Sequence, residues 1–113
     1  MAEEILIVHA AFPSIETGRT IVATLIEEGL IAAASLFPRV ESVYPSGDTV
    51  QAASEVSAML KTTRSCLLPL AKRYRALHPR HLARFLTVSV DDGLPDYVRW
   101  LEESLSGAAD QAW

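Results

Sequence analysis

Thr49–Thr63 reads TVQAASEVSAMLKTT and is the longest alternating stretch of the sequence. Its even positions are small or apolar, whereas several of its odd positions are polar. Successive side chains of a strand point to opposite faces, so the alternation predicts a strand with one dry and one mostly polar face. Most strands are only about five or six residues long. We expect this longer one to outrun its neighbours and to leave backbone groups with which another chain can pair.

The segments before this strand predict a strand, a helix and a second strand. The apolar run Ile5–Ala11 is typical of a strand buried on both faces. Ser14 is a good helix N-cap and Gly29 a natural helix stop, so a helix is expected between them. Leu30–Phe37 is another strand-like run, which Pro38 interrupts.

The alternating stretch is expected to form the second arm of a hairpin. Val40–Tyr44 resumes the strand pattern after the proline, and Pro45–Asp48 has the composition of a turn. Residues 30–61 therefore predict a hairpin whose first arm contains a break.

The second half of the chain changes to a helical period. One helical stripe contains Leu67, Leu70, Ala71, Tyr74 and Leu77. Pro69 is expected in the first turn or at a kink, and His78-Pro79 should end the helix because the residue before a proline disfavours helical angles. Ala83–Val90 predicts a fourth strand. A last helix is expected from Pro95, with an inward stripe of Val98, Leu101 and Leu105.

The order of these elements predicts the fold class. It is β-α-β-β-α-β followed by a helix, which is the α+β, ferredoxin-like arrangement with both main helices on one face of an antiparallel sheet. We expect a single domain over residues 1–105 and a flexible tail over residues 106–113.

Composition indicates a chain that associates with other copies of itself. The chain has 113 residues, of which 50% are hydrophobic, and its mean hydropathy is +0.19. So small a domain cannot hide all of a large apolar content, so we expect partner subunits to cover some of it. The alternative is that many small alanines inflate the hydrophobic fraction.

Several partners and locations are not favoured. No apolar run approaches the roughly 18–20 residues of a membrane span, and the start, MAEEILIV, lacks the basic segment of a secretory signal. The single cysteine, Cys66, cannot form an internal disulfide, so a cytoplasmic location is expected. A net charge of −4 and a pI near 5.3 argue against nucleic acid as a partner.

Several segments together resemble one known family. These are IVATLIEEGLIAAASLFP, SVY before the turn, SEVSAMLKTT, the His-Pro pair in ALHPRH, and DYVRWLEESL. In order and spacing they resemble the divalent-cation tolerance proteins, the CutA family. The resemblance implies a homotrimer of ferredoxin-like subunits whose long hairpins pair between subunits. It also implies a link to tolerance of copper and other divalent metals, with no established catalytic reaction.

The sequence departs from the family pattern at several positions. Ala33 stands where family members usually have a cysteine, and Pro45 and Ser46 replace bulky aromatics after the retained Tyr44. The family's HPYExPE-type segment keeps only His78-Pro79. The resemblance thus implies a preserved scaffold with fewer polar groups.

Copper or another divalent metal, bound weakly, is the only cofactor that the residues suggest. Copper favours imidazole and sulfur donors, and His78 and His81 are the only close histidine pair. The alternative is that both are exposed loop residues. His9 is expected to be a core or interface histidine, and Cys66 to be a small buried hydrophobe rather than a reactive thiol.

A second set of residues is expected at a cleft between subunits, on the family resemblance. It comprises Tyr44, Glu55, Lys61, Asp96, Tyr97 and Trp100. Glu55 and Lys61 share a strand face by parity. Three interpretations follow: an intersubunit charge pair, a small-anion site, or a solvated pair that only helps the register of the subunits. Tyr97 and Trp100 are interpreted as packing anchors of the last helix.

Three functions are compared. The first is a homotrimeric scaffold or binding protein of the cation-tolerance type. The second is a small-molecule sensor like the PII proteins, which need a long loop where this chain has only Pro45–Asp48. The third is an enzyme, but the sequence contains no GxSxG elbow and no Gly-rich phosphate loop. We predict that the protein is not an enzyme.

Overall fold

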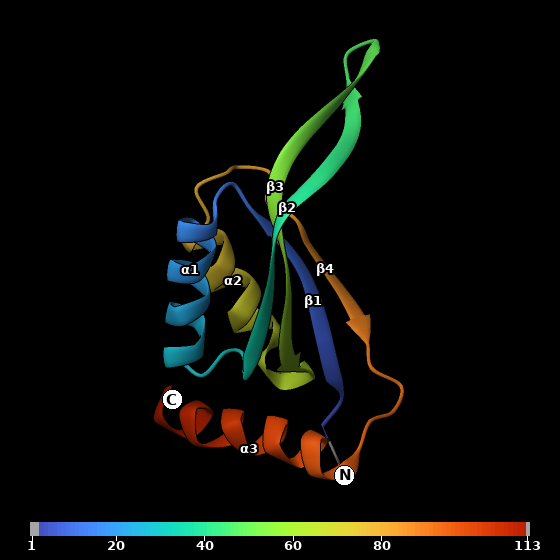
Figure 1. Cartoon of the computed structure of the whole chain (residues 1–113). Coiled ribbons are helices and arrows are strands. Elements are labelled where there is room, and N and C mark those ends of the chain that lie inside the picture. Colours follow the sequence, from blue (N-terminus) through green and yellow to red (C-terminus); the bar gives the residue numbers. More distant parts are fainter. Residues whose placement is uncertain (1–2, 113) are drawn as a thin grey trace.

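The computed structural model describes residues 3–112, and their side chains through residue 105. The elements are β1 (Ile5–Phe12), α1 (Ile15–Glu27), β2 (Ala33–Ser46), β3 (Thr49–Thr63), the short 3-10 turn η1 (Arg64–Cys66), α2 (Leu67–Leu77), β4 (Phe85–Ser89) and α3 (Pro95–Ala112). Figure 1 shows their arrangement. This order confirms the predicted β-α-β-β-α-β pattern followed by a helix.

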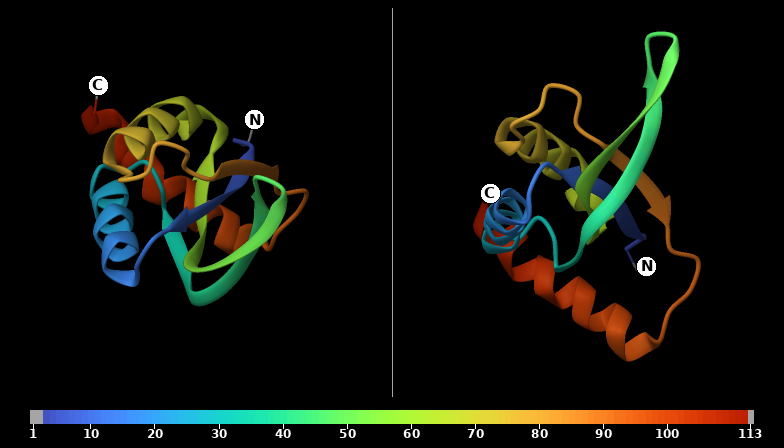
Figure 2. Two further views of the ribbon diagram at one scale, coloured as in Figure 1. Left: turned by 90° about the horizontal axis from the view of Figure 1, so that it is seen from above. Right: turned by 45° about the horizontal axis from the view of Figure 1, so that its top comes forward.

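The strands form one antiparallel sheet in the order β2-β3-β1-β4. Helices α1 and α2 cover one face of this sheet, and α3 lies across the end of the sheet opposite the hairpin (Figures 1 and 2). The α+β class and the sheet topology of the ferredoxin-like arrangement are therefore confirmed.

Helix α1 begins and ends where the sequence predicts. The Ser14 hydroxyl oxygen accepts a hydrogen bond from the backbone N–H of Thr17 at 3.1 Å, which is an N-cap. At the other end Gly29 has a positive φ of 73°, and the Leu30 N–H donates to the Leu25 carbonyl at 3.0 Å. This is a Schellman end, which needs a left-handed residue that glycine adopts without strain.

The core lies between the sheet and the pair of helices α1 and α2. Strand β1 turns Val8, Ala10 and Phe12 into it, and Tyr74 of α2 packs against the Phe12 ring with the ring centroids 6.0 Å apart. One buried hydroxyl, that of Thr62, donates to the Leu30 carbonyl at 2.7 Å. The core is thus apolar, and the Thr62 hydroxyl within it binds a backbone carbonyl.

The β2–β3 hairpin projects well beyond the rest of the chain (Figure 1). Near its tip Val43 and Val50 are 64% and 74% exposed. The dry face predicted for the whole of β3 is therefore correct only from Val56 onward, where Val56 and Leu60 are buried, because the distal part has nothing in its own chain to pack on. This confirms that the strand outruns its neighbours.

The hairpin closes with a tighter turn than predicted. Ser46 pairs with Thr49, so only Gly47 and Asp48 form the loop, and the predicted turn at Pro45–Asp48 was two residues too long. Gly47 has a φ of 62°, as the first loop residue of a type II′ turn requires. Proline at an edge strand needs no ladder donor, which is why Pro45 is tolerated inside β2.

The predicted break in the first arm is a β-bulge. Pro38 and Arg39 together oppose Val56, between the pairs Phe37–Ser57 and Val40–Glu55. Arg39 has a positive φ of 68°. The strand therefore bends and continues, rather than ending at Pro38.

The sheet face opposite α1 and α2 carries exposed apolar side chains. Phe37, Leu86 and Val88 are 43%, 66% and 51% exposed on it, and His9 and Met59 are directly opposed there and half-buried. We call this the open face. Its apolar character accounts for part of the high hydrophobic content.

Helix α3 starts at Pro95 as predicted and buries Leu101 and Leu105, whereas Val98 is only half-buried. It extends to Ala112, past the expected domain end at residue 105. The flexibility of residues 106–113 stays a prediction, and Trp113 lies outside the described residues. None of the helices within residues 3–112 is both long and apolar enough to cross a membrane.

Candidate functional site

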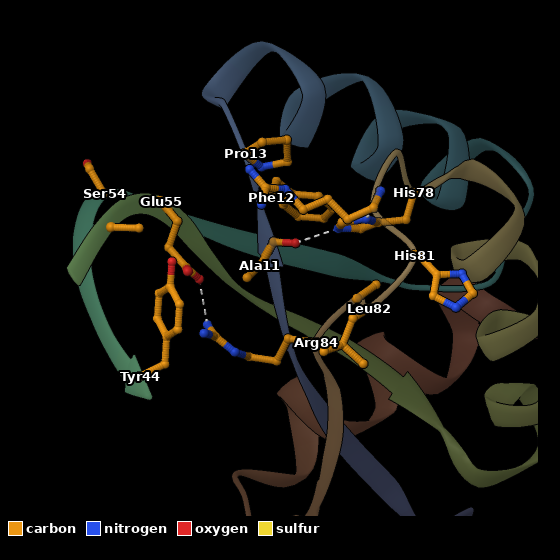
Figure 3. Close-up of a pocket in the computed structure, with 13 residues that line it drawn as sticks. Ala11, Phe12, Pro13, Tyr44, Ser54, Glu55, His78, His81, Leu82 and Arg84 are labelled. Carbon is orange, nitrogen blue, oxygen red and sulfur yellow. Dashed lines mark hydrogen bonds and ion pairs between the residues drawn. The ribbon is translucent and has the colours of Figure 1, made fainter. Parts of the chain in front are cut away.

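A cleft of about 620 Å³ lies at the base of the hairpin (Figure 3). The end of β1 forms its floor, the hairpin forms one wall, and the loop of residues 78–84 between α2 and β4 forms the other. We call it the hairpin cleft. It brings together Tyr44, Glu55, His78 and His81 from the predicted sites.

His78 is buried in the wall of this cleft and both of its ring nitrogens are in use. Its Nε2 lies 2.7 Å from the Ala11 carbonyl oxygen, and the Arg80 backbone N–H donates to its Nδ1 at 3.0 Å. Because a carbonyl only accepts, these contacts require the neutral tautomer with the proton on Nε2. The ring also stacks on Phe12, with centroids 5.6 Å apart. Pro79 favours an extended backbone at His78, whose ψ is 133°, and this conformation places the His78 ring at the end of β1.

His81 is exposed, and its ring points away from that of His78 (Figure 3). Through residue 105 no three His, Cys, Asp or Glu side chains gather in a way that could hold a metal ion. The alternative, that both histidines are exposed loop residues, is wrong for His78, because its side chain is buried and its ring nitrogens contact backbone groups. The pair thus does not fit a preformed metal site, and metal binding there stays a prediction.

The Tyr74 hydroxyl links the loop of residues 78–84 to the end of β1. Its hydroxyl donates to the Arg84 carbonyl at 2.7 Å and lies 3.4 Å from the Ala11 carbonyl. Burial raises the pKa of Tyr74 to about 12, because the phenolate would be poorly solvated. The neutral phenol therefore fixes the end of the loop against the end of β1.

Glu55 is paired within its own chain. Its Oε2 lies 2.8 Å from Arg84 Nη1, an ion pair without a well-aligned hydrogen bond, so this buried oxygen keeps an unused lone pair. Arg84 Nη2 reaches Ser42 Oγ at 3.5 Å, and Tyr44 points toward the ion pair (Figure 3). Arg84 was missed in the sequence, because no strand parity relates a loop residue to Glu55.

Lys61 is found at a separate place. Its Nζ donates to the Tyr97 hydroxyl at 2.8 Å and lies 5.0 Å from the centroid of the Tyr97 ring. The Tyr97 and Trp100 rings are 5.6 Å apart, whereas Asp96 is exposed and faces Arg99 at 3.9 Å. Together with Leu94 and Pro95 these rings line a second, more open recess. The predicted cleft set is therefore divided between two places within one chain.

The remaining candidates have structural positions. Cys66 is buried at 7% exposure, in agreement with a small hydrophobe. His9 is half-buried on the open face, with Met59 and Leu86 opposite it on the neighbouring strands. Neither residue lines the hairpin cleft, because Cys66 is buried and His9 lies on the open face.

The fold and this geometry define a small ferredoxin-like α+β domain with a projecting hairpin and an open apolar sheet face. The chain belongs to the CutA1 divalent ion tolerance protein family, whose family model matches residues 6–104. The family resemblance noted in the sequence is thereby confirmed.

Individual relatives agree with this assignment. The chain is 35% identical over 98 residues to the divalent-cation tolerance protein CutA of Pyrococcus horikoshii, covering 87% of this chain and 95% of that protein. It is 29% identical over 99 residues to the chloroplastic protein CutA of Arabidopsis thaliana, where the match covers 88% of this chain but only 54% of the relative. The crystal structure of CutA1 from Oryza sativa superimposes with a TM-score of 0.87 at 27% identity, covering 91% of this chain and 94% of that one.

Proposed function

We propose that this protein acts as a homotrimer in the cellular response to divalent metal ions, copper in particular. It serves as a scaffold or binding protein rather than a catalyst, and it works in the cytoplasm. Membership of the CutA1 family supports the link to divalent cations. The trimer, the copper response and the location go beyond that membership and require their own tests.

The open face of the sheet is the observation that carries the proposed assembly. Leu86 and Val88 of β4 and Phe37 of β2 are each between 43% and 66% exposed on one surface. Contiguous apolar surface of this kind is unusual on monomers and marks interaction sites. Since α1 and α2 cover only the other face, copies of the chain can bury this one by turning their sheets toward a common axis.

The hairpin supports the same proposal. A two-stranded hairpin is marginally stable in water when nothing covers it. Here the distal residues Val43 and Val50 contact no core of their own chain. Both β2 and β4 are also edge strands, with free backbone groups that a neighbouring copy can pair with. Burial of the hairpin by neighbours supplies what the isolated chain lacks.

Mass measurement by light scattering at micromolar concentration tests the assembly. We expect a trimer for the natural sequence and a smaller species for the double variant Leu86→Glu/Val88→Glu, because charge on the open face prevents its burial. The control is Leu68→Glu, which places one glutamate on an exposed position of α2 and should leave the trimer intact. A monomeric natural protein, or a double variant that still forms trimers, would contradict the proposal.

A direct contact with metal is constrained by the structure. His78 Nδ1 and Nε2 both bind backbone groups, so His81 is the histidine of this loop that can offer a nitrogen, with further ligands from another copy. Calorimetry with Cu(II) and Zn(II) on the natural protein and on His81→Ala tests this contact. Equal binding by the two proteins would remove His81 from the metal role, whereas the trimer proposal would stand.

The alternative of a PII-like sensor has no supporting observation in the hairpin. Such a sensor needs a long flexible loop between the middle strands, but here Gly47 and Asp48 alone connect β2 to β3. A thermal-shift screen with nucleotides discriminates between the two functions, and stabilisation by a nucleotide would favour the sensor.

A further inference from the structure

We propose that the hairpin cleft binds a small organic anion, in which a carboxylate or phosphate group is attached to a compact apolar body. The cleft is formed by one chain alone, so this proposal does not depend on the proposed trimer or on its metal response. Its volume of about 620 Å³ lies in the range of small-molecule sites.

The charge of the cleft differs from that of the whole chain. The chain carries a net charge of −4, yet the cleft has two guanidinium groups, Arg80 and Arg84, and only one carboxylate, Glu55. His81 adds a further nitrogen that can donate a hydrogen bond. Arginine is well suited to anion recognition because its planar N–H groups match a carboxylate or phosphate.

The two arginines retain free donors. Arg84 uses Nη1 toward Glu55 and Nη2 in a long contact of 3.5 Å to Ser42, which leaves other N–H groups of its five for a ligand. Arg80 is exposed, and its side chain makes no ion pair with any residue in the described part of the chain. An anion entering the cleft therefore finds donors that the fold has not used.

The backbone that carries these arginines is held at two points. His78 Nδ1 accepts from the Arg80 N–H at 3.0 Å, and the Tyr74 hydroxyl donates to the Arg84 carbonyl at 2.7 Å. Both supporting side chains also contact the Ala11 carbonyl, at the end of β1. Because the two anchors are buried, the loop presents both guanidinium groups from a fixed frame, which lowers the entropy cost of binding.

Part of the remaining lining of the cleft is apolar. Phe12 and Pro13 line it at the end of β1, and Leu82, which is 93% exposed, stands at its rim. A leucine exposed to this extent gains from covering by an apolar ligand body. A bare inorganic anion would leave these surfaces wet, so the geometry favours an organic anion.

Three ligands with the same ring separate the chemical possibilities. Benzoate carries a carboxylate, phenyl phosphate carries a phosphate, and benzamide is neutral. We expect NMR titration of the natural protein to give shifts at residues 78–84 with at least one of the two anions, at an affinity about tenfold above benzamide, as expected for charge-assisted hydrogen bonds. Whichever anion binds more tightly identifies the recognised group.

Two arginine variants provide the decisive comparison. Arg80→Gln removes a cleft charge at an exposed side chain and should weaken binding about tenfold. Arg75→Gln removes the same charge from an exposed position of α2 outside the cleft and should leave affinity within about twofold. Equal weakening by both variants, binding of benzamide as tight as that of the anions, or no shifts with either anion would overturn the proposal. Light scattering on the same samples reports the trimer separately.

Discussion

Replacing Tyr74 with phenylalanine tests the account of how the hairpin cleft is held in place. The substitution removes one oxygen and keeps the ring, which packs on Phe12 and on Phe85 with ring centroids 6.0 Å and 5.1 Å away. It deletes the hydroxyl that donates to the Arg84 carbonyl at 2.7 Å. The Ala11 carbonyl is not orphaned, because His78 Nε2 still donates to it at 2.7 Å.

The magnitude follows from these contacts. One neutral hydrogen bond contributes about 1 kcal/mol, and the Arg84 carbonyl lies in a loop where water can replace the lost donor. We therefore expect Tyr74→Phe to lower the free energy of unfolding by about 1 kcal/mol, measured by urea denaturation at equal protein concentration.

The same residue predicts a pH dependence of known sign. The pKa of Tyr74 is raised to about 12 in the fold, above its ordinary value of about 10 in the unfolded chain. The contribution of the phenol to stability is therefore fully present below pH 10 and is lost as the pH rises toward 12. The natural protein should lose stability in this window more steeply than Tyr74→Phe does.

Absorbance of the phenolate near 295 nm provides the direct measurement. The chain has three tyrosines, and Tyr44 and Tyr97 are each 44% exposed. The ionisation of Tyr74 should appear as a step displaced to high pH in the folded protein, and Tyr74→Phe should lack this step. If Tyr74→Phe gives the same titration curve at high pH as the natural protein while both are folded, or if the variant is as stable as the natural protein, the reasoning is refuted.

Three further substitutions probe local structure, each by thermal or urea unfolding. Ser14→Ala removes the N-cap of α1 and should cost about 1 kcal/mol, whereas Ser14→Asp should retain most of the stability. Gly47→Ala meets no atom within 4 Å but places a side chain at a φ of 62°, so a loss of about 1 kcal/mol is expected from backbone strain alone, and Gly47→Asn should lose less. Gly18→Ala would bring its Cβ to 3.0 Å from the buried Phe12 ring. We expect the cost of overpacking, about 1–3 kcal/mol, to exceed the gain in helix propensity. A variant that is more stable than the natural protein would instead show that Phe12 can move.

Local signals made most of the fold predictable. The cap at Ser14, the left-handed stop at Gly29 and the end of α2 before Pro79 depend only on residues close in sequence, and all three are confirmed. The turn of the hairpin was less accurate, because the composition of Pro45–Asp48 does not reveal that Ser46 still pairs with Thr49. The register in which two strands pair depends on both strands, so the composition of the turn alone does not determine where pairing stops.

The hairpin cleft could be predicted only in part. The histidine pair was visible in the sequence. Its division into a buried His78 and an exposed His81 depends on where the fold places the Ala11 carbonyl, near the end of β1, relative to the loop. The Glu55–Arg84 ion pair joins residues from different elements, and nothing local relates them. Sequence periodicity shows which face of an element a residue occupies, but not what another element places opposite it.

The projecting hairpin changes the outline of a single copy of the chain. Its principal extents are 49 × 28 × 21 Å and its radius of gyration is 15.0 Å, against about 13 Å for a compact domain of this length. An isolated copy in solution is therefore elongated, and small-angle X-ray scattering from it carries the asymmetry of a rod-like particle. In the proposed assembly the hairpins lie along neighbouring copies, so we expect the particle to become rounder as it becomes heavier, and scattering can follow this linked change of shape and mass.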